Sequence, residues 1–177
     1  ASGGKGRGRE VIAVARSADL IMMVLDGAKE MNNQHRNILE RELESMHIRL
    51  NKYPPDIYFK KKPGGGVKFN TVVPLTKFGE DPGDAVKRIL HHYKIHNCEI
   101  LFREDASVDD LIDILEGNRK YIRCLYVYNK IDTLSIEEVD ELARKPNSIV
   151  ISVQLKLNID VMLQTMWDYL GLIRVYT

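Results

Sequence analysis

The fold is decided by one stretch, Cys124-Leu125-Tyr126-Val127-Tyr128-Asn129-Lys130-Ile131-Asp132, in which an apolar run stops at a polar cluster. Two other short apolar runs end in the same way: residues 20–25 stop before Asp26, and residues 148–151 stop before Ser152. Runs that are apolar at every position are typical of strands covered on both faces, as in a parallel α/β sheet. We therefore predict three parallel strands whose polar ends line one edge of a sheet.

Helical patterns lie between and after these runs. Apolar residues recur at helical spacing in residues 33–46, 108–121 and 159–170. Residues 135–144 begin with Ser135 and have Glu138 three positions later, which is the pattern of a capping box. Strands and helices alternate along the chain, and this predicts an α/β fold.

The stretch from residue 48 to residue 104 interrupts the alternation. Residues 57–62 and 67–73 have strand patterns, and the loop Pro63-Gly64-Gly65-Gly66 between them predicts a hairpin. A helix at 84–93 and a strand at 99–102 follow. We predict a small α+β insert at 48–104 that divides the main domain into residues 1–47 and 105–171, with residues 172–177 beginning a further region.

The strand-end residues Asn129, Lys130 and Asp132 are candidates for binding a ligand, because ligands of open α/β sheets bind beyond the carboxyl ends of the strands. The Asp132 carboxylate can accept two hydrogen bonds side by side, which matches the N1 and N2 donors of guanine and not adenine. Asn129 can donate to the base, and the aliphatic part of Lys130 can lie against the purine ring. The alternative is a polar turn in which Asn and Asp serve only as turn and capping residues.

A second motif, Ser152-Val153-Gln154, follows the last apolar strand. The Ser152 hydroxyl can orient Asp132, and the backbone N–H of Val153 can reach the guanine carbonyl oxygen. We therefore predict a guanine site that consists of Asn129, Lys130, Asp132, Ser152 and Val153.

These two motifs, with Gly3-Gly4-Lys5-Gly6-Arg7-Gly8 at the start of the chain, resemble the Obg-like GTPases of the P-loop NTPase superfamily. The resemblance is to the developmentally regulated GTP-binding proteins of eukaryotes, and it covers essentially the whole chain. It implies a partial Ras-like parallel-sheet G domain, without its N-terminal strands, and an insert similar to a ribosomal-protein βαβ fold. The residues Gly4, Lys5, Gly6, Arg7 and Gly8 would be the remnant of switch II.

The same resemblance implies a function for the complete protein. It implies a cytoplasmic GTPase that binds GTP and GDP with Mg²⁺, takes part in translation, and has the ribosome and a zinc-finger regulatory protein as partners. The chain itself has no phosphate-binding loop of the form Gly-x4-Gly-Lys-Ser/Thr. We expect a fragment that lacks this loop and the C-terminal TGS domain, with no catalytic residue or metal ligand of its own. The alternative function is a non-catalytic interaction module for a protein or the ribosome, with a vestigial nucleotide site.

The composition adds few constraints. Lys and Arg number 26 against 25 Asp and Glu, so the charge of the whole chain predicts neither nucleic acid nor a membrane as partner. Locally, Lys60-Lys61-Lys62 could contact ribosomal RNA, and a solvated hairpin is an equal alternative. We predict that Met22 and Met23 fill the core and that Cys98 and Cys124 are buried. For His91, His92 and His96 we predict a solvated helix end and no metal site.

Overall fold

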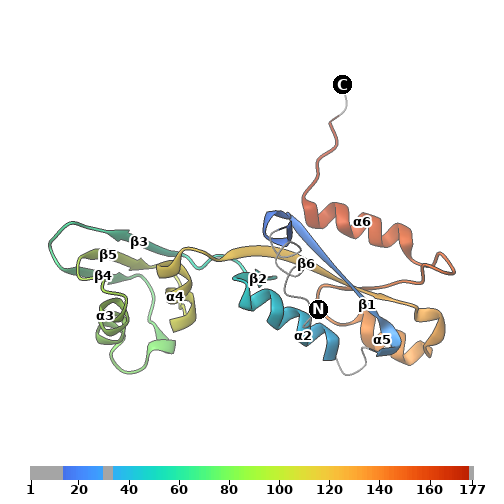
Figure 1. The fold of residues 1–177 in the computed structure, drawn as a ribbon, viewed down its shortest axis with the longest axis horizontal. Helices are drawn as coiled ribbons and strands as arrows, with labels where there is room; N and C mark the ends of the chain where they lie inside the picture. Colours follow the sequence, from blue (N-terminus) through green and yellow to red (C-terminus); the bar gives the residue numbers. More distant parts are fainter. Residues whose placement is uncertain (1–13, 30–33, 176–177) are drawn as a thin grey trace. The chain divides into compact units, whose positions relative to one another are not determined.

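The computed structural model describes residues 14–29 and 34–175, which form two compact units (Figure 1). Unit 1 consists of the described residues up to Lys52 and from Lys120 onward, and unit 2 is Tyr53–Arg119. The elements of unit 1 are, in order, β1 (Leu20–Asp26), η1 (Gly27–Lys29), α2 (Gln34–Ser45), β2 (Ile48–Leu50), β6 (Lys120–Asn129), η3 (Ile131–Thr133), α5 (Ile136–Ala143), β7 (Ser148–Val150) and α6 (Ile159–Leu170). The remnant of switch II predicted at Gly4 to Gly8 lies outside the described residues.

The sheet of unit 1 is parallel, as the three apolar runs predict. Strand β6 is central, with β1 and β7 beside its second half and the short β2 beside its first three residues. All of these pairs are parallel. The predicted α/β class is therefore confirmed.

Helices cover both faces of this sheet. On one face, side chains of β1, β6 and β7 pack with Leu39 and Leu43 of α2 and with Val139 of α5. On the other face, Leu125 and Val127 of β6 pack with residues of α6. In Figure 1, α2 and α5 accordingly lie on one side of the sheet and α6 on the opposite side. Residues 124–128 of β6 are buried because helices cover both faces of the sheet there.

Strand β1 departs from this pattern. Its continuous apolar run predicts burial on both faces, and Met23 and Leu25 are buried, but Met22 is 41% exposed and Val24 is 56% exposed. Helix α6 packs on β6 and β7 and not on this part of β1. The prediction that Met22 fills the core is therefore wrong, and the prediction that Met23 does so is confirmed.

Two helix ends show how local sequence sets the elements of the chain. Ser135 accepts a hydrogen bond from the N–H of Glu138, whose carboxylate accepts one from the N–H of Ser135, so the predicted capping box begins α5. By contrast, the helix predicted at 108–121 ends at Glu116. Gly117 takes a left-handed conformation (φ 62°) that terminates it, and β6 begins at Lys120.

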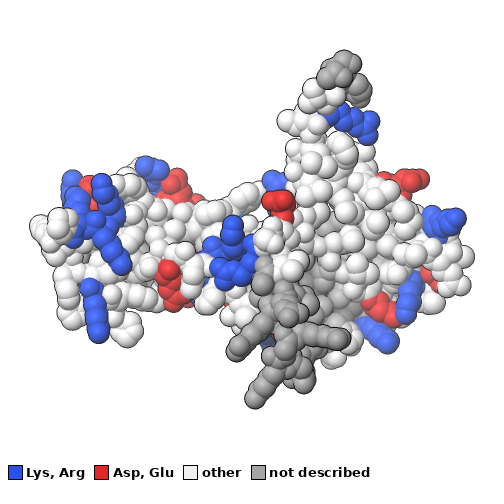
Figure 2. Space-filling model, turned by 45° about the horizontal axis from the view of Figure 1, so that its top comes forward, with Lys and Arg blue, Asp and Glu red and all other residues white. Residues whose placement is uncertain are grey.

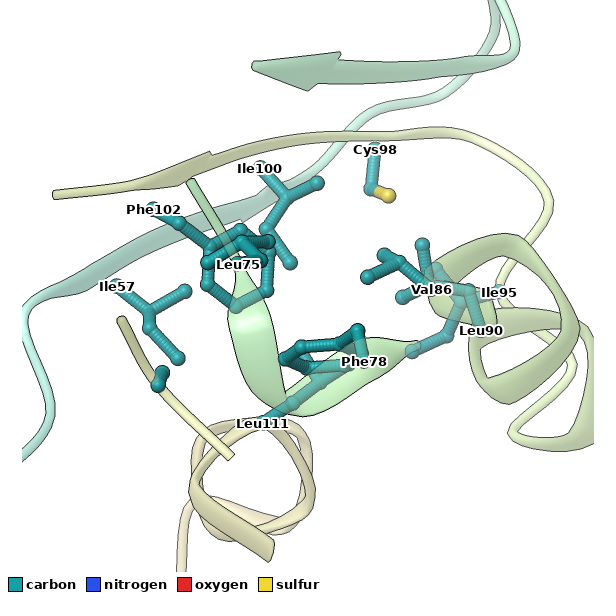
Figure 3. Close-up of a cluster of buried hydrophobic side chains, with 11 residues drawn as sticks. Ile57, Leu75, Phe78, Val86, Leu90, Ile95, Cys98, Ile100, Phe102 and Leu111 are labelled. Carbon is teal, nitrogen blue, oxygen red and sulfur yellow. The ribbon is translucent and has the colours of Figure 1, made fainter. Parts of the chain in front are cut away.

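Unit 2 is a three-stranded sheet covered on one face by two helices. Its elements are β3 (Ile57–Lys61), β4 (Val67–Thr71), η2 (Thr76–Phe78), α3 (Pro82–His92), β5 (Cys98–Phe102) and α4 (Val108–Glu116). Figure 3 shows the core, in which Ile100 and Phe102 of β5 face Val86 and Leu90 of α3 and Leu111 of α4. These side chains are fully buried.

The strand order of unit 2 is β3-β5-β4, so the predicted hairpin between the first two strands is wrong. Strand β5 lies between them, antiparallel to β3 and parallel to β4. The connection β4–α3–β5 is thus a βαβ unit, and the glycine-rich loop joins two strands that are not neighbours. Unit 2 also differs in its limits from the predicted insert at 48–104: β2 pairs with β6 in unit 1, and α4 packs on the core of unit 2.

Candidate functional site

The carboxyl ends of β1, β6 and β7 meet at one edge of the sheet of unit 1. Asp26, the last residue of β1, pairs in register with Asn129, the last residue of β6. Val150, the last residue of β7, pairs with Tyr128, and Ser152 follows two residues later. The parallel register therefore brings together Asp26, Asn129 and Ser152, which are far apart in the sequence.

The Asn129 side chain ties two loops of this edge together. Its Oδ1 accepts hydrogen bonds from the backbone N–H of Lys130, at 2.8 Å, and from that of Val153, at 3.1 Å. Both partners are donors, so the amide oxygen must face them and Nδ2 must face away. Lys130 permits this arrangement by taking a left-handed conformation, with φ 67° and ψ 37°. The other polar atom of the Asn129 side chain, Nδ2, therefore remains as a hydrogen-bond donor.

Asp132 is oriented by Ser152. The Ser152 hydroxyl donates to Asp132 Oδ1 at 2.5 Å and accepts from the N–H of Leu155 at 3.2 Å. Ser152 itself is 0% exposed, and its backbone pairs with Leu157 in an isolated antiparallel bridge. The serine is thus fixed on three sides, while the Asp132 side chain lies at the surface. The arrangement holds one carboxylate oxygen and leaves the other directed to a ligand or solvent.

Asp26 is a part of this edge that the sequence prediction missed. The ammonium group of Lys130 donates to Asp26 Oδ2 at 2.8 Å. This hydrogen bond lowers the pKa of Asp26 and raises the pKa of Lys130. The Lys130 side chain is still 60% exposed, so the ion pair orients this side chain but adds little to the stability of the fold. The signal was present in the sequence, because Asp26 directly follows an apolar run in the same way as Asn129 does.

Gly27 directly follows β1 and lies close to the end of β6. A Cβ atom at this position would lie 3.1 Å from the backbone oxygen of Asn129 and 3.1 Å from Leu134 Cδ1. Such contacts are tighter than the packed interior normally allows. A larger residue at this position would therefore push the end of β1 against the end of β6.

The structure brings all five predicted guanine-binding residues to one place. Asn129 ends β6, Lys130 and Asp132 follow it, and Ser152 and Val153 follow β7. One detail differs from the prediction, because the N–H of Val153 donates to Asn129 Oδ1. This N–H would have to be shared with a guanine carbonyl oxygen. Among the described residues, no group of three or more His, Cys, Asp and Glu side chains has the arrangement of a metal site.

Comparison with known proteins agrees with the resemblance seen in the motifs. A family model described as the C-terminal region of the MMR_HSR1 domain matches residues 64–172, which is more than half of the chain. The chain therefore belongs to this family.

Individual relatives carry names that refer to guanine nucleotides or G proteins. The chain is 63% identical to developmentally-regulated G-protein 2 of Arabidopsis thaliana, 59% identical to developmentally-regulated GTP-binding protein 2 of Homo sapiens, and 52% identical to guanylate binding protein 128up of Drosophila melanogaster. Each match covers the whole chain, but it covers only 43% of the first relative and 47% of the other two. The resemblance to developmentally regulated GTP-binding proteins is confirmed, and the chain spans less than half of the length of these relatives.

Proposed function

We propose that Asn129, Lys130, Asp132, Ser152 and Val153 bind the guanine base of GTP or GDP, in a protein that hydrolyses GTP to GDP when it is complete. The observation that carries the proposal is the hydrogen bond from the buried Ser152 hydroxyl to Asp132 at 2.5 Å. A carboxylate fixed at the carboxyl edge of a parallel sheet, beside an amide donor, is complementary to guanine. The names of the relatives support the same nucleotide.

Each residue has a separate task in the proposed site. Asp132 accepts hydrogen bonds from N1 and N2 of guanine, and adenine cannot present that pair of donors. Asn129 donates from Nδ2 to an acceptor on the base. The aliphatic part of Lys130 lies against the ring, and Asp26 holds its ammonium end. The residues thereby select the base and do not take part in the chemistry at the phosphates.

Phosphate chemistry is assigned to the complete protein. Phosphoryl transfer depends on a phosphate-binding loop and on Mg²⁺, which neutralises charge on the phosphates. The chain carries no Gly-x4-Gly-Lys-Ser/Thr pattern in its 177 residues. We assign to these residues the binding of the base and assign no step of hydrolysis to them.

The wider setting of the complete protein is proposed from the family resemblance. We propose a cytoplasmic, translation-associated GTPase whose partners are the ribosome, with contact to ribosomal RNA, and a zinc-finger regulatory protein. The βαβ connection of unit 2 supports the proposal that it is an insert of the ribosomal-protein type. In the described part of the chain, no helix combines the length and the apolar character needed to span a membrane.

The substitution Asp132→Asn tests the proposed base selection in the full-length protein. Asparagine offers an amide donor in place of one acceptor, which suits the 2-oxo group of xanthine better than the 2-amino group of guanine. We expect the affinity for GDP to fall at least about tenfold and the affinity for xanthosine diphosphate to rise by a similar factor. Both are measured by displacement of a fluorescent nucleotide.

Asp140→Asn is the matched control, because Asp140 lies on the exposed side of α5 and pairs with Arg144 outside the site. It should leave both affinities unchanged. An unchanged preference in Asp132→Asn would overturn the role of the carboxylate. That result would favour the non-catalytic interaction module with a vestigial nucleotide site.

A further inference from the structure

Within unit 2, all of whose residues are described, both helices pack on one face of the sheet and leave the other face open. Residues alternate along its strands, so Phe59, Ile100 and Phe69 face the core, while Lys60, Glu99 and Lys68 lie opposite one another on the other face. Tyr58 comes two residues before Lys60 on β3 and lies on the same face. It is opposite Leu101 and is 42% exposed. This open face thus combines an exposed aromatic ring with lysines.

One carboxylate organises the lysines of the open face. Glu99 on the central strand forms ion pairs with Lys62 at 2.7 Å and with Lys68 at 3.3 Å. Hydrogen bonds from Lys62 and Lys68 lower the pKa of Glu99, so the carboxylate stays ionised and keeps both ammonium groups in place. Lys60 lies directly opposite Glu99 in the register. Two ammonium groups therefore contact one carboxylate, and a third lysine lies opposite it in the sheet.

The glycine-rich loop, Pro63 to Gly66, joins β3 to β4 at the end of the sheet that carries Lys62 and Lys68. Gly65 and Gly66 have φ of 95° and 72°, and no atom lies within 4 Å of the position of a Cβ on either one. Asn97, on the loop before β5, holds both sides of the connection: its side-chain oxygen accepts from the N–H of Gly66, and its backbone oxygen accepts from the N–H of Lys62. The loop is thus anchored at its base and open at its tip, where a phosphate can approach the backbone closely.

The loop end of unit 2 is its more basic end. It carries Lys60, Lys61, Lys62 and Lys68, whereas at the opposite end of β5 Arg103 pairs with Asp56, and Glu104 and Asp105 follow. Figure 2 shows the blue Lys and Arg atoms gathered over the loop end of this unit, at the left of the picture. The face is therefore locally basic although the whole chain carries a net charge of only +1.

We propose that the open face of the unit 2 sheet and its glycine-rich loop bind single-stranded RNA. Lys60, Lys62 and Lys68 contact phosphates, and Tyr58 stacks on a base. Electrostatic attraction to phosphates supplies most of the affinity of such surfaces, and stacking on an aromatic ring is tolerant of sequence. An acidic peptide could bind to the lysines alone. The exposed Tyr58 ring offers in addition a surface on which a base can stack, and this favours RNA.

The proposal names the surface for the RNA contact put forward above, and it does not depend on the guanine site. Asp132→Asn, which alters the proposed guanine site in unit 1, should bind RNA as the unsubstituted chain does. Failure of one proposal is thereby distinguishable from failure of the other.

The test measures binding of a fluorescein-labelled single-stranded 20-nucleotide RNA to the chain by anisotropy, at several salt concentrations. The triple substitution Lys60→Gln, Lys62→Gln, Lys68→Gln should weaken binding at least about tenfold at low salt. It should also reduce the slope of log affinity against log salt by about 2, because each lost phosphate contact removes about 0.7. The matching substitutions of these lysines by Arg keep the charges and should retain affinity within about threefold.

The control removes three positive charges from exposed positions of unit 1, by Arg41→Gln, Lys120→Gln and Arg144→Gln. It should leave RNA affinity nearly unchanged. Equal weakening by the control would overturn the proposal, because the interaction would then follow net charge and not this face.

The aromatic contact has its own pair of variants. Tyr58→Ser should weaken RNA binding about tenfold, the order expected for one stacked base. Tyr53→Ser should have no effect, because Tyr53 is 82% exposed but lies outside the sheet. If Tyr58→Ser binds normally and polyglutamate displaces the RNA, the surface fits an acidic protein partner and the proposal is wrong.

Discussion

The Asn129 side chain has two tasks, and two substitutions separate them. Its Oδ1 accepts from two backbone donors, at 2.8 Å and 3.1 Å, and in the proposed site its Nδ2 donates to the base. Asn129→Asp keeps an acceptor for both N–H groups and loses the donor. Asn129→Ala loses both functions, so only the alanine variant should loosen the loops that follow β6 and β7.

The expected magnitudes follow from these contacts. A hydrogen bond of this kind contributes about 1 kcal/mol net, and both donors lie near the surface where water can replace the lost acceptor. We expect Asn129→Ala to lower the free energy of unfolding by about 1–2 kcal/mol and Asn129→Asp to lower it by less than about 0.5 kcal/mol. Both should weaken GDP binding by about tenfold or more, because a base acceptor then has no donor.

Two measurements on the same variants test this reasoning. Urea unfolding of the chain gives the stability, and displacement of fluorescent GDP from the full-length protein gives the affinity. The reasoning fails if Asn129→Asp binds GDP as tightly as the unsubstituted protein, since the donor would then have no role. It also fails if the two variants are equally destabilised.

Three further predictions concern the packing of the site and of the two cores. Ser152→Ala should lower the free energy of unfolding by about 1–3 kcal/mol, measured in urea, because a buried hydroxyl bond to a carboxylate is lost. Gly27→Ala should cost about 1–3 kcal/mol in the same assay, whereas Gly64→Ala, with nothing within 4 Å, should be nearly neutral. Cys98 and Cys124 are fully buried, and burial raises the pKa of both thiols, that of Cys124 to about 12. Neither should react with a disulfide reagent at pH 8 until the chain is unfolded, and stability should fall as the pH rises from about 9 toward 12, because the unfolded thiols ionise first.

The sequence was sufficient for the elements that hold the proposed site. The apolar runs within β1, β6 and β7 stop at Asp26, Asn129 and Ser152, so both the existence of the three strands and their common edge could be predicted. The start of α5 could be predicted from Ser135 and Glu138 because a capping box is a local device. These features depend on residues that are close together in the chain.

The errors concern features that depend on distant residues. The loop at Gly64 to Gly66 resembles a hairpin turn, but β5 inserts between β3 and β4, and strand order is set by packing across the whole unit. The apolar run of β1 does not reveal that α6 packs elsewhere and leaves Val24 exposed. The position of Asp26 after an apolar run marks it as a strand-end residue, but its ion pair with Lys130, 104 positions away, could not be predicted from the sequence.

The proposed guanine site is held in its binding geometry by contacts within the protein. Ser152 fixes Asp132, two backbone donors fix Asn129, and Asp26 fixes the end of Lys130. Groups that are already ordered lose little conformational entropy when a ligand binds, so the interaction with the base is available for discrimination. Phosphate contacts would raise the affinity for guanine and adenine nucleotides alike, because both carry the same phosphates. If the proposed site binds the base, we therefore expect this edge of the sheet to set the ratio of the two affinities, and the ratio should persist in nucleosides that have no phosphate.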